Sequence, residues 1–108
     1  MKTRILLIIV APLLSFSVQA GFQSGNELLT DIGKGSGGDY MFAMGYVVGV
    51  FDAFSGLSHC VTANGVTQWQ AILIAKKYLE SHPEELHKEA DVLLQEAFKA
   101  AFPCGTKP

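Results

Sequence analysis

Apolar residues recur along this chain with the spacing of α-helices, and four segments predict helices. The first begins with a capping box, in which Ser24 is followed by Glu27, and it predicts a short helix over residues 25–31. The glycine-rich "GKGSGG" comes next and predicts a mobile loop, because so many glycines disfavour any regular element. Residues 39–57 predict the second helix, which is apolar on nearly every side and is therefore expected in the middle of the fold.

Two more helices follow the turn-rich connection "SHCVTANGV". Thr67 and Gln70 form a second capping box, which predicts the start of the third helix. The fourth is predicted to run without a break from a cap at Ser81 or His82 to Phe102. Its predicted buried residues are Leu86, Ala90, Leu93, Leu94, Ala97 and Ala101. No segment alternates as a strand does, so we expect an all-α domain of four helices, orthogonal or bundle-like.

Small residues recur at every fourth position of the second predicted helix, at Gly45, Gly49 and Ala53. Such a face has no side-chain bulk, so another helix can approach it closely. We expect that helix to come from the same domain or, across a two-fold axis, from a second copy of the chain.

The N-terminus has the pattern of a secretory signal peptide. Lys2 and Arg4 precede an apolar run, and Val18-Gln19-Ala20 places small residues where a signal peptidase reads them. A membrane anchor is the alternative, but Pro12 interrupts the run, which is shorter than the roughly 20 residues that a span needs. We therefore expect residues 1–20 to be removed, leaving a single exported domain over residues 21–108 without a membrane anchor.

The charge of that mature domain argues against nucleic acid as a partner. Without Lys2 and Arg4 the basic count falls from 8 to 6 against 10 acidic residues, which gives a formal charge of −4. The remaining basic residues are scattered lysines, which bind phosphate less specifically than arginine does. A basic partner surface is the better expectation.

The chain has two cysteines, Cys60 and Cys104. In an exported protein two cysteines usually form one disulfide, so we expect these two to be bonded to each other, with pairing between two chains as the alternative. A bridge across so long a loop contributes about 4 kcal/mol in the chain-entropy model.

No catalytic, metal or cofactor site is predicted. "GKGSGG" matches a dinucleotide fingerprint only in letters, because helices rather than strands flank it. His82 and His87 lie five positions apart and would point away from each other on a helix, so they could not share a metal ion. His59 and Cys60 are adjacent and make a poor nucleophilic pair. We therefore expect a protein that is no enzyme and works by binding.

The segments "GNELL", "FAMGYVVGVFDAFSG", "HC", "VTQWQ", "YLESHPEELHKEA" and "EAFKAAFPC", in this order, resemble the Rap/Tai family of type VI secretion immunity proteins over Gly25 to Cys104. The resemblance implies a small helical protein of the periplasm, often dimeric, so a homodimer is one expected assembly. It also implies a partner: a peptidoglycan amidase effector injected by sister cells, which the immunity protein binds and blocks. Relatives commonly carry a further cysteine pair where this chain has Ile32 and Ala43.

Loops are the expected contact sites, because a convex helical body enters a concave active site only through a projecting segment. We predict that partner contacts come from His59, Thr62, Asn64 and Gln68, and that residues 34–38 form a second candidate loop. The alternative function is a small periplasmic stress chaperone with a helical fold. Such a chaperone would suppress aggregation of unrelated proteins in acid, whereas an immunity protein would bind one amidase at neutral pH.

Overall fold

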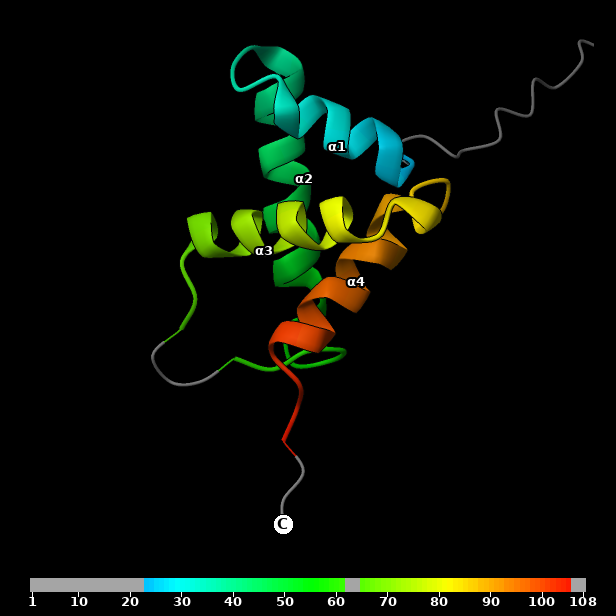
Figure 1. Ribbon diagram of the computed structural model, residues 1–108. Helices are drawn as coiled ribbons and strands as arrows, with labels where there is room; N and C mark the ends of the chain where they lie inside the picture. The colour runs from blue at the N-terminus through cyan, green and yellow to red at the C-terminus, as the bar shows by residue number, and fades with distance from the viewer. Residues whose placement is uncertain (1–22, 62–64, 106–108) are drawn as a thin grey trace, which may run out of the picture.

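The computed structural model describes residues 23–61 and 65–105, which form an array of four α-helices (Figure 1). The helices are α1 (Gly25–Gly33), α2 (Gly38–Phe54), α3 (Gln68–Ser81) and α4 (Ala90–Ala101), with a 3-10 turn, η1 (Pro83–Glu85), between α3 and α4. In these two segments there is no β-strand, only two isolated bridges. The predicted all-α class and the four helices are confirmed. None of the four helices has the length and hydropathy that crossing a bilayer requires.

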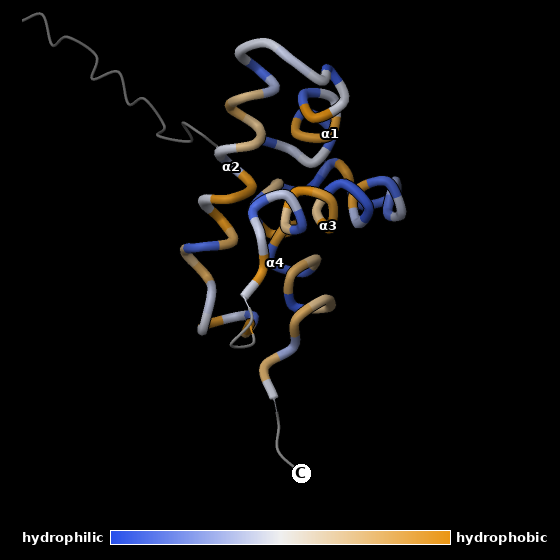
Figure 2. The backbone as a smooth tube through the Cα atoms, turned by 90° about the vertical axis from the view of Figure 1, so that its left-hand side faces the viewer, coloured by the Kyte–Doolittle hydropathy of each residue, from blue (hydrophilic) through white to orange (hydrophobic). Residues whose placement is uncertain are grey.

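One hydrophobic core joins the four helices. Each helix contributes at least one completely buried side chain: Leu28 from α1, Val47 from α2, Leu79 from α3 and Phe98 from α4. α3 crosses over α2 (Figure 1), whereas α2 lies along one edge of the molecule with the other helices all to one side of it (Figure 2). The outer side of α2 is therefore left without a neighbouring helix.

Both predicted capping boxes are present. The Ser24 hydroxyl accepts a hydrogen bond from the Glu27 amide at 3.1 Å, and the Ser24 amide donates to the Glu27 carboxylate at 3.0 Å. Thr67 and Gln70 make the same reciprocal pair at 3.1 and 2.8 Å. These local bonds satisfy amide groups that the first turn of a helix leaves unpaired, which explains why α1 and α3 begin where the sequence indicates.

The prediction of one unbroken fourth helix is wrong, because residues 86–89 leave the helical path before α4 begins. Glu89 is extended, with φ −68° and ψ 139°. The freed carbonyls pair with the start of α1: Gly25 donates to the carbonyl of Lys88 and Asn26 to that of Leu86, both at 2.9 Å. The break therefore supplies acceptors for first-turn amides of α1.

This junction between α1 and α4 is closely packed at Gly25. A Cβ atom there would lie 2.5 Å from Cδ1 of Leu93 and 3.2 Å from the backbone Cα of Leu86. Leu86 and Ala90 are buried as predicted, whereas Ala101 is exposed, and Phe98, which the predicted stripe did not include, is completely buried.

The loop between α1 and α2 is closed by ion pairs. The Lys34 ammonium lies 3.2 Å from the Asp31 carboxylate, at the end of α1, and 2.7 Å from that of Asp39, at the start of α2. Its hydrogen bond to Asp39, followed by that to Asp31, raises the pKa of Lys34. Ile32 and Ala43, the positions at which the resemblance implies a further cysteine pair, are both buried, so the two helices are joined here by packing and an ionic link.

α2 ends three residues earlier than predicted, at Phe54. Ser55 is extended and Gly56 has a φ of +85°, a left-handed conformation that favours glycine. The Gly56 amide then donates to the carbonyl of His59 at 2.7 Å, which reverses the chain and directs it toward α4.

Candidate partner-binding surface

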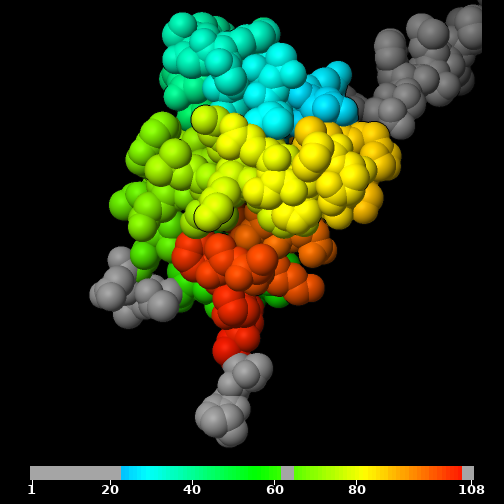
Figure 3. Space-filling model, viewed as in Figure 1, coloured from blue at the N-terminus to red at the C-terminus, as the bar shows by residue number. Residues whose placement is uncertain are grey.

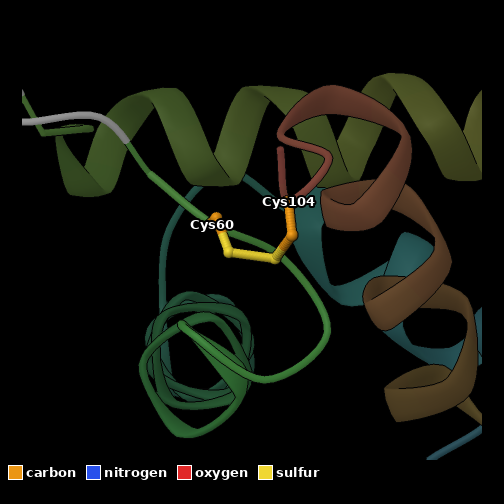
Figure 4. Close-up of a disulfide and its surroundings, with 2 residues drawn as sticks. All are labelled: Cys60 and Cys104. Carbon is orange, nitrogen blue, oxygen red and sulfur yellow. A yellow bond between two sulfur atoms is a disulfide. The ribbon is translucent and has the colours of Figure 1, made fainter. Parts of the chain in front are cut away.

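The connection between α2 and α3 is tied to the end of α4 by a disulfide (Figure 4). Cys60 and Cys104 are bonded at an S–S distance of 2.02 Å, which confirms the predicted intrachain pairing. The amide of Cys60 also donates to the carbonyl of Phe102 at 2.9 Å. Two bonds, one covalent and one between backbones, therefore fix the first part of the connection.

His59 does not lie where the sequence prediction placed it. Its side chain has no exposed surface, so it cannot contact a partner while the fold is intact. The ring packs among the aromatic rings of Phe51, Phe98 and Phe102, with centroids 4.5, 5.4 and 6.5 Å away. Neither ring nitrogen has a hydrogen-bond partner, and burial lowers the pKa of His59. His59 thus anchors the connection to the core, and its prediction as a contact residue is corrected.

The other predicted contact residues lie further along the connection. Thr62 and Asn64 are outside the described residues. Gln68 is exposed in the first turn of α3, and the cap of that helix is formed by Thr67 and Gln70 instead, which leaves the Gln68 side chain outside the capping box. Gly65, shortly before α3, has a φ of +76°.

The two predicted loops do not come together. Figure 1 shows the α1–α2 loop and the α2–α3 connection at opposite ends of α2. That helix has 17 residues, which at 1.5 Å each separates the two loops by about 25 Å. The two loops therefore cannot form one continuous contact site. Of the two, only the α2–α3 connection is fixed by the disulfide.

The small-residue face of α2 is not packed by the rest of the described chain. Gly45, Gly49 and Ala53 are exposed, and a Cβ atom at either glycine would meet nothing within 4 Å. The expectation that this face packs on another helix of the same domain is therefore wrong. Packing across a two-fold axis stays a prediction.

Large apolar side chains that the sequence reasoning did not single out are also exposed. They are Met41 and Phe42 on α2, Leu57 in the turn after it, Trp69 and Leu73 on α3, and Val92 on α4. The signal that could have identified them is the absence of charge: between Tyr40 and Ala75 the only Asp, Glu, Lys or Arg is Asp52.

A shallow groove of about 340 Å³ lies between α3 and α4. Tyr78 and His82 form part of its lining, their rings stacked at 3.9 Å, and Nδ1 of His82 donates to the carbonyl of Tyr78 at 2.8 Å. This bond caps the end of α3 and fixes the His82 ring. Within the described segments no three His, Cys, Asp or Glu residues lie together as a metal site would require.

Comparison with known protein families shows the family of this chain. The family model of the Rap1a immunity proteins matches residues 24–104, which include all four helices and both cysteines. No curated protein matches the chain.

Proposed function

Because the chain belongs to the Rap1a immunity protein family, we propose that it is a periplasmic immunity protein that binds and blocks a type VI secreted peptidoglycan amidase. In this role it protects the producing cell from the amidase that sister cells inject. The observation that carries the proposal is the family match over the whole disulfide-bonded helical domain.

Export accounts for the disulfide. Disulfides persist in oxidising compartments such as the periplasm and are rare in the cytosol. The Cys60–Cys104 bond and the signal-like segment at residues 1–20 both support cleavage after Ala20 and action in the periplasm.

Inhibition requires only that the amidase cleft be occupied. The connection between α2 and α3 suits this role, because His59 and Cys60 fix its first part and the capping box of α3 fixes its last. Segments held on a rigid scaffold lose little freedom on binding. The mature charge of −4 favours encounter with a basic enzyme surface, so association is expected to slow as the salt concentration rises.

The outer side of α2 suits a second copy of the chain. Gly45, Gly49 and Ala53 allow the backbone of another helix to come close, and Met41 and Phe42 add apolar area on the same helix. A two-fold axis would bring this face against itself, which is the commonest arrangement of homodimers.

Protection in cells tests the proposal. A type VI secreted peptidoglycan amidase is expressed in the periplasm of a sensitive host, alone and together with the full-length chain. We expect the chain to prevent lysis, and we expect Asn64→Ala combined with Gln68→Ala to weaken protection without lowering the melting temperature. Thr30→Ala, an exposed position on α1, is the control. Lysis in the presence of the unaltered chain, for every type VI amidase tried, would contradict the proposed function.

A further inference from the structure

Charged residues are distributed very unevenly along this chain. From Tyr40 to Ala75 there is one charged residue, Asp52, and this segment contains α2 from its third residue on and the first half of α3. Five of the six exposed large apolar side chains lie in it, the exception being Val92. Met41 and Phe42 lie near the start of α2 and Leu57 beyond its other end, so a contiguous interaction surface has to be sought among neighbouring residues of one helix.

On α3 two of these residues form a short stripe. Trp69 and Leu73 are one turn apart, so they lie on the same side of the helix, and they are 56% and 45% exposed. The buried residues of α3 lie on a different side of the helix: Ala71, Ile72, Ala75 and Leu79. The core is therefore complete without the stripe. In Figure 3, α3 lies at the front of the molecule, and no other helix covers it from this side.

The stripe is bordered by charge. Continuing along the same side of α3, the next residues are Lys76 and Glu80, which form an ion pair at 3.8 Å. The helix thus changes from apolar to charged at its midpoint. An apolar centre beside a charged border is the usual composition of a protein–protein contact, and tryptophan is among the residues that most often dominate the binding energy.

Trp69 is also held by a rigid support. It lies between Thr67 and Gln70, whose side chains are both engaged in the capping box of α3. A large side chain on a fixed helix turn loses little conformational freedom when a partner covers it. Gln68, already a predicted contact, is its immediate neighbour in the chain.

We propose that Trp69 and Leu73 form the apolar anchor through which this chain binds its effector enzyme. The proposal rests on the proposed function and names the helix surface that acts together with the α2–α3 connection. Because α3 begins directly after the connection, an enzyme whose cleft rim surrounds the connection would also cover the first turns of α3. The enzyme surface that fits is an apolar, uncharged pocket beside the cleft, large enough for an indole ring.

A second copy of the chain is the competing occupant, and the surface of α2 argues against it. α2 offers glycines that admit a helix backbone, whereas α3 offers a protruding side chain that needs a pocket. A dimer about one two-fold axis uses one patch of each subunit. With α2 used in that way, the α3 stripe of each subunit remains free for the enzyme.

The test compares three lysine substitutions. Trp69→Lys and Leu73→Lys place a charge in the stripe, and Val92→Lys places the same charge on α4 at a side chain that is 45% exposed, as Leu73 is. The probe is a type VI secreted peptidoglycan amidase with its catalytic cysteine replaced by alanine, and Kd is measured by calorimetry. We expect the two stripe variants to weaken binding by at least about tenfold and the control to change Kd by less than about twofold.

A spectroscopic measurement on the chain without these substitutions also tests whether the enzyme covers Trp69. Trp69 is the only tryptophan of the chain, so a fluorinated tryptophan gives a single fluorine NMR signal. We expect that signal to shift when the amidase is added to the unaltered chain and to Val92→Lys alike.

The outcomes distinguish failure of the proposed function from failure of the proposed anchor. If the unaltered chain binds no type VI amidase, the proposed function fails and the anchor fails with it. If the unaltered chain binds but all three variants bind equally well, or the fluorine signal does not move at saturation, only the anchor is wrong. If Trp69→Lys alters the sedimentation of the chain alone, the stripe is a contact between copies and the proposal is overturned.

Discussion

Acid should weaken the fold through His59. Its ring is completely buried among Phe51, Phe98 and Phe102 without a partner for either nitrogen, so the folded protein holds it neutral. In the unfolded chain a histidine takes up a proton near pH 6.5. Burial lowers the pKa of His59 in the folded state, so the unfolded state binds more protons in the interval between the two values.

The sign and size of the effect follow from this difference. The contribution of the neutral ring to stability is complete above about pH 6.5 and is lost as the pH falls through the lowered folded pKa. Within that interval the free energy of unfolding decreases by up to about 1.4 kcal/mol per pH unit, the value for one proton. For a small domain this is a large share of the total stability.

Urea denaturation at a series of pH values between about 7 and 5 measures this slope, in the range where histidine titrates. His59→Leu and His59→Phe remove the titrating group, and we expect both to flatten the slope. Any constant packing cost of the substitution cancels, because only the change with pH is compared. His87→Gln, which removes a histidine with an exposed side chain, is measured beside them as the comparison variant. Equal slopes for the unaltered chain and both His59 variants would refute the reasoning.

Three further predictions concern the disulfide, the junction at Gly25 and the outer side of α2. Cys60→Ser or Cys104→Ser should cost about 2 to 5 kcal/mol of unfolding free energy, and two free thiols in the native protein, found by mass spectrometry after alkylation, would contradict the bond. Gly25→Ala should cost about 1 to 3 kcal/mol in urea denaturation because its methyl meets Leu93 and the Leu86 backbone, whereas Gly33→Ala enters open space and should not destabilise. Gly49→Leu should stabilise dilute protein by roughly 1 kcal/mol, since helix propensity improves where no neighbour lies. The same substitution should prevent the proposed homodimer, which sedimentation measures. A lower melting temperature at dilution would contradict the absence of a neighbour at Gly49.

Features that depend on residues close together in the chain were predictable from the sequence. The capping boxes at Ser24 and Thr67 use side chains and amides three residues apart, so the letters alone place the starts of α1 and α3. The disulfide was predictable for another reason: a chain with two cysteines offers one intrachain pairing, and the signal-like segment at residues 1–20 indicated an oxidising compartment.

Features that depend on distant residues were not predictable. The break before α4 places the carbonyls of residues 86 and 88 where they bond to amides at the start of α1, and no local signal in "HKEADV" reveals this. His59 stands in a polar, turn-rich segment that looks exposed, yet three phenylalanines from α2, α4 and the residue after α4 converge on it. Trp69 reads as an ordinary member of an amphipathic helix until the buried side of α3 is known.

The backbone bonds at the start of α1 also constrain the order in which parts of the fold can form as the chain is synthesised or exported. The amides of Gly25 and Asn26 find their acceptors only at Lys88 and Leu86, and Cys60 finds its partner only at Cys104. A chain that emerges from a ribosome or a translocation channel with its N-terminus first can pack α1 against α2 early, but the first turn of α1 lacks these acceptors until nearly all of the chain is available. Slowing the emergence of the last segment should lengthen the time during which the first turn of α1 remains accessible to protease.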